Sequence, residues 1–250
     1  MDEKEFNHLY NKLDSFEAVR ALEAEGYDHE LLFVIYTNRI IRDTKKRHYS
    51  VKRKSKELLS RWRRGESFLE LAREHKFSPV ITASILLQQM GWSKKRVRRS
   101  LQEPRMIEDS RIREDLRQAS DADLIYSPYG NQRQFDRGKE VELFVGRWLK
   151  ERGRGYMTEK DAQAEGHPKT PDFKLEAPIK VDGKWVNWIE CKGTFGDRVE
   201  INKNYTTQLT HYVDLFGAGM VVYWFGFIED ILRDERIIVK DKDFFTSENI

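Results

Sequence analysis

Residues 170–192 read TPDFKLEAPIKVDGKWVNWIECK, and this stretch decides the fold of the C-terminal half. Asp182-Gly183, near its middle, is a two-residue turn typical of a β-hairpin. Apolar residues on either side predict one strand over residues 171–181 and a second over residues 185–192. We therefore expect two antiparallel strands joined by a tight turn.

Three charged side chains fall at the open end of this hairpin. Because side chains alternate across a strand, Glu190 and Lys192 point to one face and Cys191 to the other. The hairpin then brings Asp172 beside them. Two converging carboxylates can hold a hard divalent cation, and a lysine next to them can contact a phosphate or a water. Metal-assisted hydrolysis of a phosphodiester requires this set of groups.

The segments outside the hairpin predict a mixed sheet with helices packed on it. Apolar spacing and turn residues indicate, in chain order, a helix over Asp136–Arg152, a strand over Tyr156–Thr158, the hairpin, a helix over Lys203–Phe216, and strands over Met220–Phe227 and Ile237–Val239. The composition changes near Asp121, and Tyr126–Asn131 has the chemistry of a turn. We therefore expect a helical domain over residues 1–120 and an α/β domain over residues 121–250.

The helical half contains the pattern of a helix-turn-helix. Ser67 and Glu70 form a capping box that opens one helix, and after a short turn Ser78 and Pro79 open a second. A third helix follows from Ser93. It carries five basic residues, namely Lys94, Lys95, Arg96, Arg98 and Arg99. We expect these residues to contact nucleic acid, although the sequence does not indicate which helix enters a groove.

Charge is unevenly distributed along the chain, although 45 basic and 42 acidic residues leave a formal net charge of only +3. Residues 39–105 carry 20 basic and 6 acidic residues, a net charge of +14. Residues 1–38 carry a net charge of −6 and residues 106–250 a net charge of −5. Such a basic block predicts a nucleic-acid-binding surface. The alternative is the solvated surface of a heat-adapted protein, because such proteins are also rich in charged residues.

Several classes of protein are excluded by what the sequence lacks. The single cysteine, Cys191, cannot form an intramolecular disulfide or a cysteine-rich zinc site. The longest strongly apolar stretches, Leu31–Tyr36 and Ala218–Phe227, fall far short of the ~20 residues that span a bilayer. The acidic stretch Met1–Glu5 has no apolar signal core. We expect a soluble cytoplasmic protein without membrane partners, associated with the nucleoid or, in a eukaryote, located in the nucleus.

The motif at the hairpin resembles a known nuclease signature. Pro171-Asp172, followed after 18 residues by Glu190-Cys191-Lys192, is similar to the signature of the PD-(D/E)XK nuclease superfamily. With Thr170 the motif begins Thr-Pro-Asp, which resembles the TPD-motif proteins of archaea and eukaryotes. The helix-turn-helix region and Tyr126–Pro128 fit that family too. The resemblance implies a mixed-sheet, restriction-endonuclease-like α/β domain preceded by an all-α helix-turn-helix domain.

Two helical segments extend the resemblance. Many members of the superfamily supply a glutamate to the metal site from the helix before the first strand. Here Glu142 is the favoured candidate and Glu140 the alternative. In the helix after the hairpin, Gln208 and Tyr212 resemble the Gln-x-x-x-Tyr motif of the RecB-like branch, and their i, i+4 spacing puts them on one helix face.

The resemblance also implies a cofactor, Mg²⁺ or Mn²⁺, and its ligands. Asp172, Glu190 and the backbone carbonyl of Cys191 would bind the cation, with Glu142 acting through a water or at a second cation. Lys192 would orient the attacking water or stabilise the transition state. Gln208, the fourth residue expected to be catalytic beside Asp172, Glu190 and Lys192, would position the lysine or the phosphate.

The expected function is therefore endonucleolytic cleavage of DNA, including structured or branched DNA, held by the basic helical domain. One alternative is a nucleic-acid-binding protein built on an inactive nuclease fold, against which the intact carboxylate and lysine set argues. Another is an endonuclease that processes RNA. Two histidines, His167 and His211, flank the expected site, and His211 is more typical of a helix surface than of a catalytic centre. The sequence does not decide whether the chain forms a homodimer.

Overall fold

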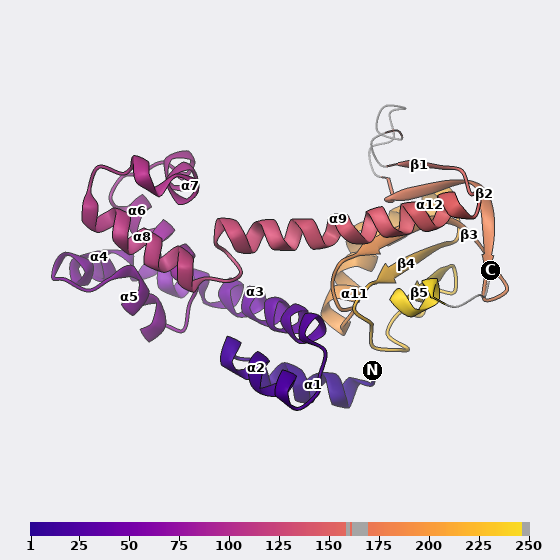
Figure 1. Cartoon of the computed structure of the whole chain (residues 1–250), viewed down its shortest axis with the longest axis horizontal. Helices are drawn as coiled ribbons and strands as arrows, with labels where there is room; N and C mark the ends of the chain where they lie inside the picture. The colour runs from indigo at the N-terminus through magenta and orange to yellow at the C-terminus, as the bar shows by residue number, and fades with distance from the viewer. Residues whose placement is uncertain (159–160, 162–169, 247–250) are drawn as a thin grey trace. The chain divides into compact units, whose positions relative to one another are not determined.

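The computed structural model describes residues 1–158, 161 and 170–246 (Figure 1). These residues belong to two compact units. We call Met1–Tyr36 together with Asp136–Ile250 the sheet unit, and Thr37–Phe135 the helical unit. The sequence predicts a boundary near residue 121, whereas the compact units divide at Tyr36 and again at Asp136. The two long helices α3 (His29–Arg53) and α9 (Pro128–Glu151) each have residues in both units.

The sheet unit contains one five-stranded mixed sheet, as the sequence predicts. Its strands lie in the order of the chain: β1 (Tyr156–Thr158), β2 (Phe173–Val181), β3 (Lys184–Lys192), β4 (Gly219–Tyr223) and β5 (Ile237–Lys240). The first three strands pair antiparallel, and β3, β4 and β5 pair parallel. Asp182 and Gly183 form the turn between β2 and β3 with φ of 48° and 80°. Positive φ at both positions is the geometry of the hairpin turn that an Asp-Gly pair favours.

Each face of the sheet is covered by helices of the same unit. On one face, Val145, Trp148 and Leu149 of α9 pack against Phe173 and Ile189 of the hairpin. On the other face lie α11 (Arg198–Asn204), the π-helical turn η2 (Tyr205–Leu209) and α12 (Thr210–Phe216), whose apolar side chains pack against Trp188 and Val221. The strand end that carries the expected site therefore lies between two helical layers.

Three predicted element boundaries are wrong, each because a local signal in the sequence is ambiguous. The helix predicted from Asp136 begins at Pro128, and Ser127 Oγ accepts a hydrogen bond from Gly130 N at 3.0 Å. Ser-Pro is thus a helix start here and not a turn. The helix predicted from Lys203 begins at Arg198, because Asp197 caps it through the amides of Val199 and Glu200.

The strand predicted over Met220–Phe227 is also shorter than expected. Met220–Phe227 is uniformly apolar, but β4 ends at Tyr223. Gly226 has a φ of 94°, and its amide donates to the Tyr223 carbonyl at 2.9 Å, which closes a turn. Phe225 then packs with a cluster that includes residues of the first two helices. Apolar side chains in this segment therefore belong to three different hydrophobic clusters.

The N-terminal helices α1 (Glu3–Lys12) and α2 (Phe16–Ala24) belong to the sheet unit. The Phe6 ring stacks on the Phe195 ring with centroids 5.3 Å apart, and Arg198 Nη2 lies 2.9 Å from Glu3 Oε2. Both partners follow β3 in the chain. These contacts between the two ends of the sequence explain why residues 1–36 do not group with the helices that follow them.

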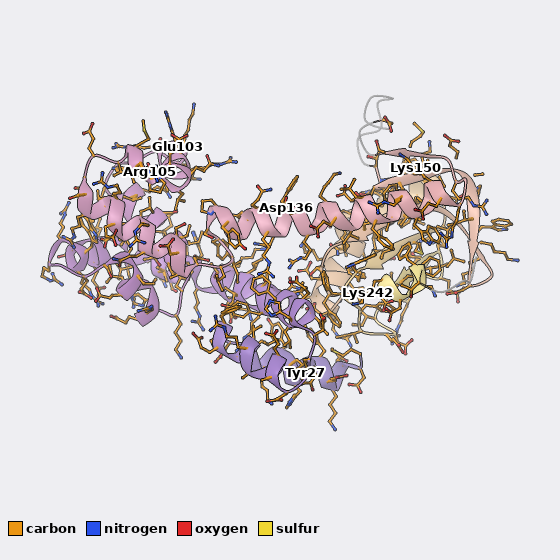
Figure 2. The ribbon with its side chains drawn as sticks, in the orientation of Figure 1. Tyr27, Glu103, Arg105, Asp136, Lys150 and Lys242 are labelled. Carbon is orange, nitrogen blue, oxygen red and sulfur yellow. The ribbon has the colours of Figure 1, made fainter. Side chains whose placement is uncertain are left out.

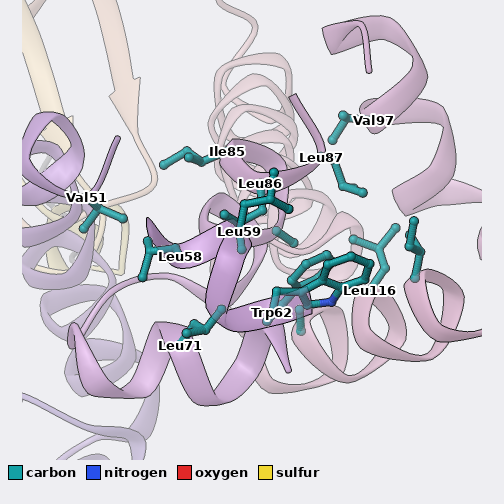
Figure 3. Close-up of a cluster of buried hydrophobic side chains, with 14 of the residues drawn as sticks. Val51, Leu58, Leu59, Trp62, Leu71, Ile85, Leu86, Leu87, Val97 and Leu116 are labelled. Atoms are coloured by element: carbon teal, nitrogen blue, oxygen red, sulfur yellow. The ribbon is translucent and has the colours of Figure 1, made fainter. Parts of the chain in front are cut away.

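The helical unit is an all-α bundle, and its core is drawn in Figure 3. Besides parts of α3 and α9, its helices are α4 (Ser55–Arg63), α5 (Phe68–Glu74), α6 (Pro79–Gln89), α7 (Lys94–Gln102), the short η1 (Pro104–Met106) and α8 (Ser110–Ala122). Leu58, Trp62, Leu86 and Leu116 from these helices meet in the core. The capping box of α5, the Ser78-Pro79 start of α6 and the Ser93 cap of α7 are confirmed. Among the described residues, none of the helices combines the length and the apolar character needed to cross a bilayer.

Candidate active site at the end of the hairpin

Hydrogen bonds from the backbone of the hairpin hold the two carboxylates that are expected to bind metal close to each other. Asp172 directly precedes β2, and its Oδ2 accepts a hydrogen bond from Cys191 N at 2.7 Å. The amide of Asp172 in turn donates to Glu190 Oε2 at 3.3 Å. Glu190 is only 4% exposed. Two carboxylates 18 positions apart are therefore neighbours, with Glu190 buried and Asp172 half-buried at the wall of a cavity.

Lys192 lies on the same side of β3 as Glu190. Its Nζ donates to Glu190 Oε1 at 2.6 Å and to Gln208 Oε1 at 2.7 Å. Gln208 lies in the π-helical turn η2, a feature that is rare in proteins and frequent at functional sites. Tyr212 takes a different position, buried with its ring 5.4 Å from that of Trp188. Within the Gln-x-x-x-Tyr segment, glutamine contacts the site and tyrosine packs in the core.

Burial and like charge set the proton affinity of the site. Burial, followed by repulsion from Glu190, raises the pKa of Asp172 to about 8. Glu142 adds to this rise, whereas the Cys191 amide and Lys192 oppose it. Burial also raises the pKa of the Cys191 thiol far above its usual range. The half-buried thiol packs against the cluster that includes Val145 and Trp148, and the backbone amide of Cys191 donates to Asp172.

The two candidate glutamates on α9 differ in position. Glu142 and Asp172 both line a cavity of about 530 Å³, and Glu142 Oε2 lies 2.6 Å from Lys139 Nζ. Glu140 is exposed and does not belong to the lining. The structure thus brings Glu142, and not Glu140, toward Asp172.

A hard divalent cation needs several oxygen ligands, and the residues of the site offer some of them. Among the described residues, no group of three or more His, Cys, Asp or Glu side chains is arranged as a metal cluster. Asp172 and Glu190 nevertheless converge, and a divalent cation would offset the repulsion from Glu190 that, after burial, raises the pKa of Asp172. Oxygen ligands of this kind would suit Mg²⁺ or Mn²⁺.

The remaining predicted residues lie outside this arrangement. Lys94, Lys95, Arg96, Arg98 and Arg99 are exposed on α7 of the helical unit. Arg96 lies over the Trp92 ring at 3.8 Å, and Arg99 Nε lies 3.6 Å from Glu103 Oε2. His211 is exposed on α12, as its position on a helix surface predicts, and His167 lies outside the described residues.

One interaction that supports the site is not predicted by the sequence. Arg137 Nε donates to the Gly193 carbonyl at 3.0 Å, which joins α9 to the residue after Lys192. A Cβ added at Gly193 would lie 3.1 Å from Gly138 Cα, so the backbones of α9 and of the β3 end approach closely. The signal in the sequence is the pair of glycines, Gly138 and Gly193, 55 positions apart, and local patterns cannot connect them.

The sequence of the chain matches a known family. Residues 108–243 match the family described as "Protein of unknown function TPD sequence-motif". This chain belongs to the TPD family. Its Thr170-Pro171-Asp172 tripeptide supplies the aspartate that meets Glu190 in the site. No solved structure matches this TPD-family chain.

Curated relatives carry the name CDAN1-interacting nuclease 1. The protein of that name from Danio rerio is 35% identical over 182 residues, which cover 69% of this chain and 61% of the relative. The Homo sapiens protein is 31% identical over 181 residues, covering 69% of this chain and 64% of the relative. The TPD-family chain therefore spans somewhat less than two thirds of the length of these relatives, and its similarity to them supports a nuclease-related role.

Proposed function

We propose that this protein is a metal-dependent endonuclease that hydrolyses phosphodiester bonds of DNA, with a PD-(D/E)XK-like sheet unit as its catalytic part. One observation carries the proposal. Lys192 Nζ lies within hydrogen-bonding distance of both Glu190 and Gln208, while the Asp172 amide bonds to the same Glu190 carboxylate. A protein that only binds nucleic acid has no need for this arrangement. The name of the relatives supports the same class of activity.

In this proposal Asp172, Glu190 and the Cys191 carbonyl hold Mg²⁺ or Mn²⁺, and Glu142 acts through a water or at a second cation. The cation would lower the pKa of a bound water and offset charge on the scissile phosphate. The hairpin fixes the two carboxylates before any cation arrives, because Cys191 N holds Asp172 and Lys192 holds Glu190. The two carboxylates therefore lose their conformational entropy when the chain folds, and not when the cation binds.

Lys192 contributes electrostatic stabilisation. An ammonium group has three hydrogen-bond donors. Two of them point to Glu190 and Gln208, which fixes the direction of the third. A phosphate oxygen or the attacking water can accept this third hydrogen bond, and Gln208 holds the ammonium in place for it. A fixed charge of this kind stabilises the negative charge that develops in the transition state.

The helical unit would hold the substrate. Exposed lysines and arginines on α7 can neutralise phosphates, and α5, α6 and α7 have the order and capping of a helix-turn-helix. We expect this surface to bind the duplex part of the substrate. Its contacts would add affinity without selecting a base sequence, since lysine and arginine contacts to phosphates carry no sequence information.

The test uses one defined hairpin made in a deoxyribose and a ribose version. Each version is incubated with the full chain in Mg²⁺, in Mn²⁺ and in EDTA. We expect cleavage of the deoxyribose version that requires either cation. Cleavage of the ribose version alone would assign the protein to RNA processing. Tight binding with no cleavage of either version would identify a binding protein on an inactive nuclease fold.

A further inference from the structure

The cavity of about 530 Å³ beside Asp172 is built on one face of α9. Lys139, Leu143, Arg147 and Lys150 line it at spacings of three and four residues, which places them along a single helix face. Lys150 lies near the C-terminal end of α9 and is labelled in Figure 2. We call this cavity the α9 groove.

Charge changes along the α9 groove. At the Asp172 end, Glu142 is acidic and Lys139 Nζ is paired with it at 2.6 Å. Further along the helix, Arg147 and Lys150 are exposed, and neither forms an ion pair with an acidic side chain among the described residues. The groove is therefore anionic where a cation and a scissile phosphate would lie, and cationic beyond that point.

The wall between the cations is apolar and aromatic. Leu143 is 59% exposed, and Tyr156 of β1 packs edge-on against Phe173 with ring centroids 4.9 Å apart. Gly146 also belongs to the lining, and a Cβ there would lie 2.9 Å from the Tyr156 hydroxyl. Apolar and aromatic surface interleaved with positive charge is the chemistry that binds unpaired nucleotides.

The length and volume of the α9 groove indicate which form of nucleic acid it can hold. Lys150 lies eight positions after Glu142, which is about 12 Å along an α-helix. That length corresponds to about three nucleotides of one stacked strand at a rise of about 3.4 Å each. The groove volume of about 530 Å³ is that of a small-molecule site. A volume of this size can take a few unpaired nucleotides and is too small for the whole cross-section of a duplex.

We propose that the α9 groove binds a single-stranded segment, about three nucleotides long, next to the phosphate that is cut. This inference rests on the proposed function, because the Asp172 and Glu190 pair defines where the cut falls. It makes the substrate a nucleic acid with an unpaired arm, in which Arg147 and Lys150 each neutralise one phosphate.

The experiment compares two double variants of the full chain that remove equal charge. Arg147→Gln with Lys150→Gln alters the groove, and Arg154→Gln with Lys180→Gln removes two exposed cations of the sheet unit that do not line it. Fluorescence anisotropy in EDTA measures the affinity for labelled dT₁₂, U₁₂ and a blunt duplex between about 50 and 200 mM salt. The readout does not depend on cleavage.

The groove variant should neutralise two fewer phosphates of a single strand than the wild type does. Its log–log salt slope should fall by about 1.4, and its Kd at about 0.15 M salt should rise roughly ten- to twenty-fold. The control variant should match the wild type, and the duplex affinity of both should be unchanged. Comparing the affinities for dT₁₂ and U₁₂ then shows whether the groove prefers a deoxyribose or a ribose strand.

Two results would overturn the inference: an unchanged slope for single strands in the groove variant, or an equal loss of affinity for the duplex. Either result would leave the proposed function standing if the wild type still cuts the deoxyribose hairpin in Mg²⁺ or Mn²⁺. Failure of the proposed function appears separately, as absence of metal-dependent cleavage by the wild type.

Discussion

Lys192 is the residue on which the mechanism depends most, because it touches a candidate ligand without being one. Its Nζ lies 2.6 Å from Glu190 Oε1 and 2.7 Å from Gln208 Oε1. An ammonium that shares a carboxylate with a cation repels that cation. Lys192 should therefore matter for turnover and not for cation binding.

Lys192→Ala is expected to leave Mn²⁺ affinity unchanged or higher, and to lower the cleavage rate by roughly 10²–10³-fold. Lys192→Arg should not restore the rate, because a planar guanidinium cannot replace a compact ammonium between two fixed acceptors. Calorimetric titration and single-turnover cleavage on the same preparations measure both quantities. Loss of Mn²⁺ binding together with activity in Lys192→Ala would show that the lysine is structural.

Asp172 gives a pH dependence to the metal-free protein. Its pKa is raised from 3.8 to about 8 in the folded chain, so the folded state holds the proton more tightly than the unfolded state does. The contribution of this proton to stability is fully present below about pH 4 and is lost as the pH rises through about 8. We expect the free energy of unfolding in EDTA to decrease from about pH 5 to about pH 8.5 by more in the wild type than in Asp172→Asn. Parallel curves from urea denaturation would contradict this.

At the scale of elements, local signals predict the site better than they predict its surroundings. The hairpin is predictable because Asp182-Gly183 sets its turn, and side-chain alternation then places Glu190 with Lys192. The start of α9 at Pro128 is not recognised from the sequence, because Ser-Pro occurs in turns and at helix starts alike. The π-helical turn that carries Gln208 interrupts the helix predicted over Lys203–Phe216, and the apolar spacing of the sequence does not indicate it.

The close approach between α9 and the end of β3 can be tested with two glycines. Gly193→Ala should destabilise the protein and slow cleavage, because the new Cβ would press on the Gly138 backbone at 3.1 Å and displace the helix that carries Glu142. Gly138→Ala is the matched control, since its Cβ would meet nothing within 4 Å. Removing a glycine from a helix interior should stabilise by about 0.5–1 kcal/mol. Thermal unfolding of both variants measures the difference, and equal shifts would refute the close approach.

At the scale of the whole molecule, the uneven charge is the clearest functional signal in the sequence. The net +14 of residues 39–105 falls in the helical unit, whereas the carboxylate site lies in the sheet unit. The membership of residues 1–36 in the sheet unit cannot be predicted from local patterns. That assignment depends on contacts such as Phe6 with Phe195, between positions that are far apart in the chain.

The basic helix α7 provides a test of the helical unit. Replacing Lys94, Lys95, Arg98 and Arg99 by Gln should weaken duplex binding for all base sequences alike. The log–log salt slope should fall by about 0.9 for each phosphate that is no longer neutralised, or roughly 3–4 in total. Anisotropy titrations with two duplexes of unrelated sequence measure this change. An unchanged slope would mean that α7 faces solvent in the complex.

The central claim is that the Asp172 and Glu190 pair is the catalytic metal site, and single-turnover cleavage in Mn²⁺ tests it most directly. The proteins to compare are the wild type, Asp172→Asn, Glu190→Gln and, as a control, Glu140→Gln, whose side chain is exposed on α9. We predict that the first two variants lose metal-dependent cleavage while they keep the circular dichroism spectrum of the wild type, and that the control cleaves normally. Cleavage at the wild-type rate by a folded Asp172→Asn or Glu190→Gln protein would contradict the account.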